Sequence, residues 1–171
     1  MSIGLWVRGA RPKTLATSIA SVMVGAVMAY VHIERSGTCI AIYPEPASCA
    51  TAREQQTLLM DRFWPVTILC LLVALFLQIA VNYANDYSDG IRGTDAGRDT
   101  DESKSGKPQR LTASGLVPAK HVLFAAMICA AIACICGVVA VVLAQAWWLL
   151  AVGAASLLAG WFYTGGKHPY G

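Results

Sequence analysis

The sequence predicts an all-α, multi-pass membrane helix bundle with four transmembrane helices. Of its 171 residues, 56% are hydrophobic and 13% are charged, whereas soluble domains carry about 25% charged residues. The mean hydropathy is +0.54. The apolar residues gather in long uncharged runs, which disfavours both an all-β sandwich and a disordered chain. The composition therefore favours a membrane protein.

Two uncharged runs, residues 14–31 and 63–85, are each long enough to cross a membrane as a helix. A helix rises about 1.5 Å per residue and the hydrocarbon core is about 30 Å thick. The first run follows a basic segment, as in a signal peptide, but it is longer than the apolar region of such a peptide. We therefore expect two retained helices, at about 14–31 and 64–88.

A third uncharged run, residues 121–166, is too long for one crossing and must fold back once. Gln145 is the strongly polar side chain in the middle of the run, and Trp147 and Trp148 beside it are typical of a membrane interface. The run therefore predicts two helices, at about 120–144 and 147–164.

The basic residues predict the orientation of these helices. Ten of the thirteen lysines and arginines lie before residue 14, between residues 92 and 120, or at Lys167. Because basic residues favour the cytoplasmic side, we expect a cell-membrane protein with both termini and the Asp-rich loop 86–119 in the cytoplasm, and the loop 32–62 on the other side. The formal net charge of +3 then reflects topology, and no basic surface for nucleic acid is evident.

The six cysteines divide between the two environments. Cys39 and Cys49 lie in the non-cytoplasmic loop, which we expect to be irregular, and either a disulfide or two free thiols is compatible with that location. The other four lie inside predicted helices, where they are expected to be small buried hydrophobic residues.

The most informative segment follows the second predicted helix, where six of the ten acidic residues lie between Asp86 and Glu102. If the helix continues one or two turns past the apolar run, spacings of three, four and seven residues place four polar residues on one face. These are Asn82, Asn85, Asp86 and Asp89. Stacked carboxylates near a membrane need a compensating cation, and oxygen ligands suit Mg²⁺, which often bridges carboxylates to phosphates.

Cationic side chains follow at Lys104, Lys107 and Arg110, in a glycine-rich stretch that is pliable enough to fold over a ligand. Carboxylates followed by bases suggest a site for a magnesium diphosphate. The alternative is a solvated charged loop that only fixes the topology.

Residues 85–89, Asn-Asp-Tyr-Ser-Asp, with Gly-Thr-Asp at 93–95, resemble the first aspartate-rich motif of the UbiA-type intramembrane prenyltransferases. The resemblance is to the branch that prenylates 1,4-dihydroxy-2-naphthoate, in an actinobacterial-like form. Further motifs agree in order at residues 10–15, 110–115 and 163–171. The match covers nearly the whole chain apart from residues 33–61.

The resemblance implies transfer of a polyprenyl group from a polyprenyl diphosphate to 1,4-dihydroxy-2-naphthoate within the lipid bilayer, for menaquinone biosynthesis. It implies Mg²⁺ held by Asn85 and Asp89, helped by Asp86 and Asp95. The substrate contacts that it suggests are Arg110, Lys104 and Lys107 for the leaving group, Arg11 and Lys167 for the acceptor carboxylate or the diphosphate, and Tyr83, Tyr87 and Tyr163 along the path of the allylic cation. Asn82 is a further candidate for substrate binding. Interface anchoring is an equal alternative for Tyr83 and Tyr163, and a hydrogen bond to another helix is an alternative for Asn82.

The family usually has more helices and a second aspartate-rich motif, and no aspartate follows Asp101 here. We therefore expect residues 1–171 to be the N-terminal part of one integral-membrane prenyltransferase domain, inactive without a C-terminal half or a partner chain. A CDP-alcohol phosphatidyltransferase is disfavoured because residues 89–92 do not match its motif. The remaining alternative is a small four-helix membrane carrier or assembly subunit whose acidic loop binds divalent cations.

Overall fold

The computed structural model describes residues 3–37, 47–92, 111–112 and 115–164. All regular structure in these segments is helical, which confirms the predicted all-α class. The elements in chain order are α1 (Ile3–Gly9), α2 (Pro12–Ser36), α3 (Ala47–Arg92), α5 (Ala119–Ala144) and α6 (Leu149–Thr164).

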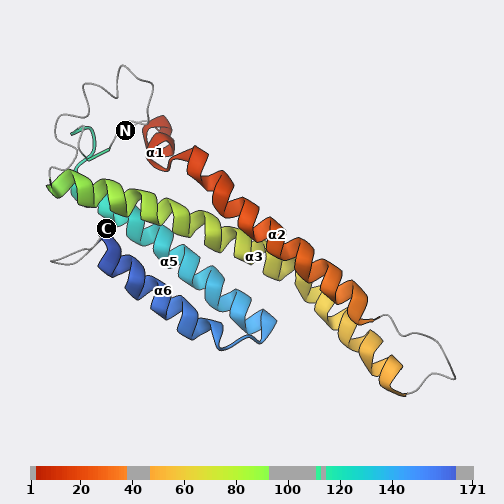
Figure 1. Cartoon of the computed structure of the whole chain (residues 1–171). Coiled ribbons are helices and arrows are strands. Elements are labelled where there is room, and N and C mark those ends of the chain that lie inside the picture. Colours follow the sequence, from red (N-terminus) through yellow and green to blue (C-terminus); the bar gives the residue numbers. More distant parts are fainter. Residues whose placement is uncertain (1–2, 38–46, 93–110, 113–114, 165–171) are drawn as a thin grey trace.

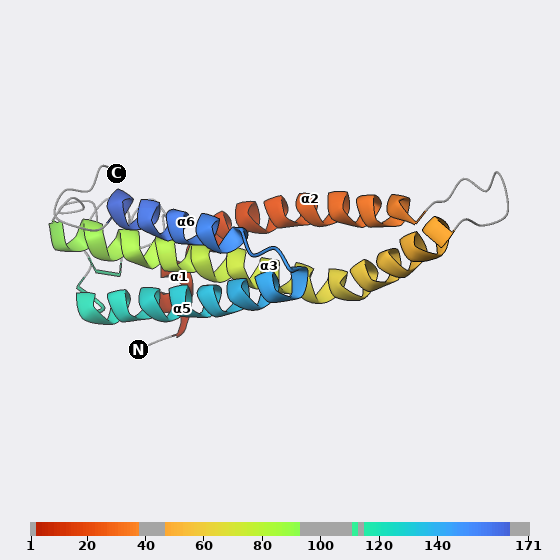
Figure 2. The same cartoon turned by 90° about the horizontal axis from the view of Figure 1, so that it is seen from below.

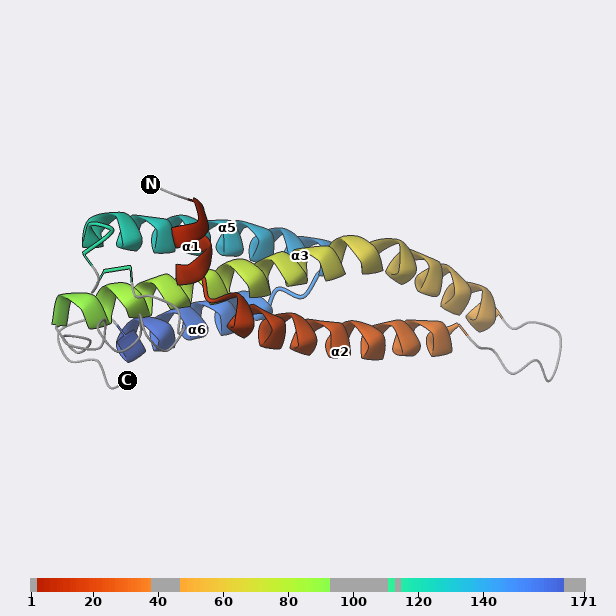
Figure 3. The ribbon, with the colours of Figure 1, turned by 90° about the horizontal axis from the view of Figure 1, so that it is seen from above.

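Helix α3 is the centre of the bundle (Figure 1). It has 46 residues, which corresponds to about 69 Å at 1.5 Å per residue. Helices α2 and α5 pack along different sides of it, and α6 returns from the end of α5 beside α3 and α5 (Figure 2). The short α1 lies across α3 and α5 (Figure 3). The end of α3, the start of α5 and the end of α6 therefore meet at one end of the bundle, together with α1.

Three helices, α2, α3 and α5, are long and apolar enough to cross a membrane. Helix α6 is also apolar but has 16 residues, about 24 Å of helix. Large apolar side chains on the outer faces are exposed, including Val24, Phe124, Met127 and Trp161 at 61–66%. Such a surface needs an apolar surrounding, so the molecule is a helical membrane protein, as the composition predicts.

The predicted non-cytoplasmic loop 32–62 is largely wrong, because α2 continues to Ser36 and α3 already begins at Ala47. An uncharged run shows only the part of a helix that lies in lipid, and the helix itself can continue past the first charged residue. Residues 47–62 contain charges but are rich in Ala, Arg, Glu, Gln, Leu and Met, which all favour helix. Helix α3 also runs to Arg92, so the acidic loop begins later than predicted, and α1 was not predicted.

Helices α5 and α6 lie within two residues of their predicted bounds, and the chain reverses at Gln145 as predicted. Gln145 has a left-handed backbone with φ 56°. Its N–H donates to the carbonyls of Val141 and Val142, and its side-chain amide donates to Val142 O at 2.8 Å. The turn thus satisfies carbonyls that the end of a helix leaves without partners.

The cysteines partly follow the prediction. Cys49 is disulfide-bonded, and the predicted partner Cys39 lies outside the described residues. The other four are free. The prediction that these four are buried is wrong, since Cys134 is exposed and Cys70, Cys129 and Cys136 are half-buried. A run of apolar residues does not show which face of a helix packs against the protein and which face points outward.

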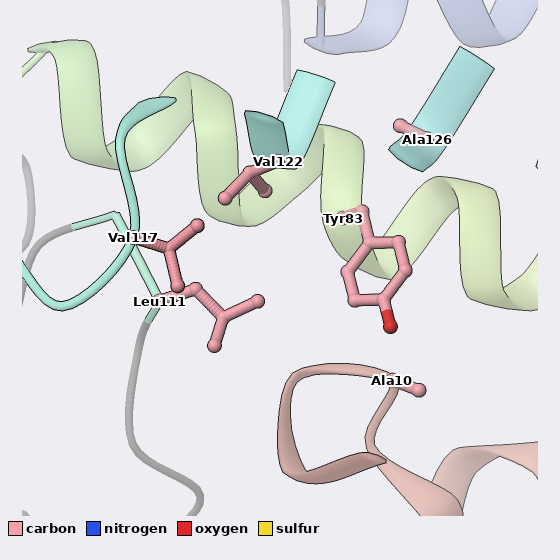
Figure 4. Packing of buried hydrophobic residues seen from close by; sticks show 6 residues of the cluster. All are labelled: Ala10, Tyr83, Leu111, Val117, Val122 and Ala126. Carbon is pink, nitrogen blue, oxygen red and sulfur yellow. The ribbon is translucent and has the colours of Figure 1, made fainter. Parts of the chain in front are cut away.

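A small hydrophobic core lies at the end of the bundle where α1, α3 and α5 meet (Figure 4). Its members are Ala10, Tyr83, Leu111, Val117, Val122 and Ala126. Leu111 is fully buried, although it follows directly on the acidic loop. The core therefore ties the N-terminal corner and the end of that loop to α3.

Gly9 permits this close packing, and its replacement by alanine is expected to destabilise the corner. A Cβ at Gly9 would lie 2.5 Å from Leu111 Cδ1 and 3.3 Å from Tyr83 Cε1, and the buried Leu111 has little room to move. Overpacking of this kind costs about 1–3 kcal/mol. Thermal unfolding in detergent should show the loss for Gly9→Ala and not for Gly4→Ala, because a Cβ at Gly4 meets nothing within 4 Å.

Candidate functional site

The polar residues at the end of α3 form two rows that differ in burial. Asn82 and Asp86, one turn apart, are 3% and 2% exposed. Asn85 and Asp89, also one turn apart, are half-buried. The sequence predicted one shared face, and the structure divides it into a buried row and a more accessible row.

Asn82 holds the N-terminal corner against α3. Its amide nitrogen donates to Ala10 O at 2.8 Å and to Thr14 Oγ1 at 3.0 Å, while Gln78 Nε2 donates to its oxygen at 3.4 Å. These bonds agree with the alternative of a hydrogen bond to another helix.

Tyr83 strengthens the same junction. Its hydroxyl donates to Trp6 O at 2.9 Å, and the two rings meet edge to face with centroids 5.7 Å apart. The ring of Tyr83 also belongs to the buried core. Tyr83 therefore packs in the protein and does not act as an interface anchor.

Asp86 receives the end of the acidic loop. Its Oδ2 accepts the N–H of Leu111 at 2.8 Å, and its Oδ1 accepts the N–H of Thr112 at 3.4 Å. A buried carboxylate needs such donors, and the buried N–H of Leu111 needs an acceptor. No sequence pattern predicted this pairing, because it depends on where residue 111 returns to α3.

Asn85 offers an oxygen that lacks a donor. Its Oδ1 is buried and, among the described residues, has no hydrogen-bond partner. Buried polar atoms without partners are rare and often mark a place for an ion or water. Asp89 follows one helical turn later and supplies a carboxylate on the same row. An amide oxygen and a carboxylate are donors that Mg²⁺ accepts, so this pair fits a magnesium ion bound to phosphate.

The described residues contain no group of three or more His, Cys, Asp and Glu side chains placed to hold a metal. Asp95 lies outside them, as do Lys104, Lys107, Arg110 and Lys167. Of the predicted ligand set, Asn85, Asp86 and Asp89 are described, and both oxygens of Asp86 already accept backbone N–H groups. A Mg²⁺ ion that keeps several waters needs few protein ligands, so Asn85 and Asp89 stay the candidates among the described residues.

Arg11 lies at the sharp corner between α1 and α2, with φ 53° and ψ 71°. A left-handed conformation is uncommon for arginine, and here Pro12 begins α2 directly after it, which disfavours a right-handed helical conformation for the residue before it. Arg11 is half-buried. Since Ala10 accepts a hydrogen bond from Asn82, the corner that carries Arg11 is fixed next to the polar rows of α3.

The two remaining tyrosines differ in their surroundings. Tyr87 is half-buried and packs against the core. Tyr163 is 49% exposed, near the end of α6, which lies at the same end of the bundle as the end of α3 (Figure 1).

The model of the UbiA prenyltransferase family matches residues 57–170. The chain belongs to the UbiA prenyltransferase family. This segment includes the polar rows of α3 and all of α5 and α6.

Relatives cover almost the whole chain. The 1,4-dihydroxy-2-naphthoate octaprenyltransferase of Mycobacterium tuberculosis is 39% identical over 99% of this chain and 46% of its own length. The proteins of the same name in Mycobacterium leprae and Escherichia coli are 36% and 28% identical over 99% and 97% of the chain. The chain thus spans about half the length of the curated relatives that it matches. No solved structure matches it.

Proposed function

We propose that this chain contributes the first aspartate-rich site of an enzyme that transfers a polyprenyl group from a polyprenyl diphosphate to 1,4-dihydroxy-2-naphthoate. The observation that carries the proposal is the buried Oδ1 of Asn85, one turn before Asp89, which has no hydrogen-bond partner in the part of the chain that the structure describes. Membership of the UbiA family supports this chemistry, and so do the names of the relatives.

In this proposal, Asn85 and Asp89 hold Mg²⁺, with Asp95 as a further carboxylate, while Asp86 accepts the N–H groups of Leu111 and Thr112 and positions the returning loop. When bound, the ion neutralises the diphosphate and stabilises it as a leaving group. Arg110, Lys104 and Lys107 add positive charge around the departing oxygens. The allylic carbon–oxygen bond breaks, diphosphate leaves with the electron pair, and a ring carbon of the acceptor supplies the pair for the new carbon–carbon bond.

The acceptor carries a carboxylate, which is lost as carbon dioxide when the prenyl chain is attached. We assign Arg11 to this carboxylate, and the assignment is supported by the hydrogen bond from Asn82 to Ala10, which holds the corner of Arg11 about one turn from Asn85. Lys167 is a second candidate. Tyr87 and Tyr163 are the aromatic residues that we assign to stabilising the allylic cation through their rings.

The proposal also includes a membrane topology. Helices α2, α3, α5 and α6 each cross the cell membrane, with both termini and the site on the cytoplasmic side, as the basic residues favour. Transfer also requires what the relatives carry beyond the aligned half, either as a C-terminal half or as a partner chain.

A chimera tests the proposal. Residues 1–171 replace the matching part of the Mycobacterium tuberculosis relative, and membranes are incubated with labelled polyprenyl diphosphate and 1,4-dihydroxy-2-naphthoate. We expect a labelled prenylated product in the lipid extract that disappears when EDTA removes Mg²⁺ and returns when Mg²⁺ is restored. The chain alone should give none. A chimera that binds divalent cations but yields no product would favour the carrier or assembly-subunit alternative.

A further inference from the structure

A cavity lies toward the end of the bundle opposite the aspartate-rich site. It has a volume of about 400 Å³ and is formed by α2, the first half of the apolar part of α3, and the end of α5. Gly25, Ala26 and Ala29 line the middle of it on α2, between Val22 and Ile33, so the middle of this wall has only small side chains. Along α3 the cavity extends from Leu59 to Cys70, about 16 Å of helix. It is thus a groove elongated along α3, with mostly hydrocarbon walls.

The mouth of the groove lies at the depth of a membrane interface. Trp64 on α3 is 63% exposed, and Trp147 and Trp148 in the α5–α6 turn are 54% and 69% exposed. Exposed tryptophans mark the level of the lipid headgroups. Arg62 lines the groove at this level, and its Nη1 donates to Leu143 O at the end of α5, at 3.3 Å.

Arg62 is the charged residue of this groove. Its side chain is exposed, and within the described part of the chain it forms no ion pair. One of its five N–H donors is used by Leu143 O. The others remain for an anion, and a guanidinium recognises a phosphate well. A phospholipid has an anionic phosphate at headgroup depth and apolar acyl chains below it. Arg62 and the apolar groove match these two parts.

We infer that the groove binds one anionic phospholipid from the leaflet opposite the aspartate-rich site, with its phosphate on Arg62 and one acyl chain along Gly25 and Ala29. The inference does not depend on prenyl transfer. Arg62 and Asp89 are 27 residues apart on the continuous helix α3, about 40 Å, so the two sites are separate.

The structure supplies a variant that closes the groove without removing Arg62. A Cβ at Gly25 would meet nothing within 4 Å, so Gly25→Leu should fill the groove with little strain. Gly153→Leu is its matched control, because Gly153 also has open space but lies on α6. Arg62→Gln removes the charge, and Arg53→Gln removes a charge from the same end of α3, away from the groove.

The experiment uses the whole 171-residue chain, purified in mild detergent and mixed with equal amounts of phosphatidylglycerol and phosphatidylcholine. Native mass spectrometry should show one bound phosphatidylglycerol in preference to phosphatidylcholine. Arg62→Gln should weaken this adduct about tenfold, since loss of one charge-assisted contact of about 1.4 kcal/mol has that effect. Gly25→Leu should abolish it, and both controls should keep it.

Several outcomes would overturn the inference. Equal binding of the two lipids would remove the role of Arg62, and an unchanged adduct in Gly25→Leu would place the lipid elsewhere. If a polyprenyl alcohol displaced the lipid, and Arg62→Gln left the amount of bound lipid unchanged, the groove would be assigned to an isoprenoid tail. A dimer that Gly25→Leu converts to a monomer would assign it to a second copy of the chain.

Discussion

Replacing Asp89 with asparagine is expected to lower magnesium-dependent prenyl transfer by about 10²–10³-fold, the usual loss when one preorganised electrostatic contact is removed. Asp89 supplies the negative charge beside Asn85 Oδ1, and an amide at this position has no net charge to hold the ion. The measurement is the initial rate of product formation by the chimera over a range of Mg²⁺ concentrations. A shift of the dependence to higher Mg²⁺ would accompany the loss.

The control for this substitution is Asp61→Asn, which removes an exposed carboxylate from the other end of α3 and should leave the rate unchanged. Asn85→Ala should also lose transfer without losing stability, because it deletes a buried oxygen that has no donor among the described residues. Full activity of both Asp89→Asn and Asn85→Ala would place the metal elsewhere and contradict the proposed site.

Replacing Asp86 with alanine is expected to destabilise the fold by about 2–4 kcal/mol, because a hydrogen bond to a charged group contributes about 1.5–3 kcal/mol. The buried N–H of Leu111 would lose its 2.8 Å bond, and the N–H of Thr112 would lose its 3.4 Å bond. The segment that returns to α3 at Leu111 would then lose its anchor on the Asp86 carboxylate. Thermal unfolding in detergent, together with proteolysis between residues 111 and 117, measures the effect.

Asp89→Asn serves as the comparison for Asp86→Ala, since the two aspartates lie in different rows. We expect the first to lose transfer with its thermal unfolding unchanged, and the second to lose stability first. The opposite result, with Asp86→Ala stable but unable to respond to Mg²⁺, would make Asp86 a metal ligand and not the acceptor that positions the loop.

The sequence predicted the elements whose signal is local. The reversal at Gln145 was visible because one polar residue interrupts a long apolar run beside two tryptophans. The end of α3 was visible because its apolar stretch leads directly into a run of Asn and Asp. The start of α3 was missed, since residues 47–62 favour helix by propensity while carrying charges that resemble a loop.

The sequence by itself determined that the protein is a helical membrane protein and that its polar chemistry lies at the end of α3. The roles within that cluster were decided only by the tertiary structure. Spacing along one helix cannot assign different roles to Asp86 and Asp89, because residues three apart lie on the same side of a helix. The difference arises from residues far away in the chain. The corner at Ala10 covers Asn82 and accepts its hydrogen bond, and the returning Leu111 covers Asp86 and donates a hydrogen bond to it. Asn85 keeps an oxygen to which no residue in the described segments donates. Long-range contacts of this kind leave no periodic signal in a sequence.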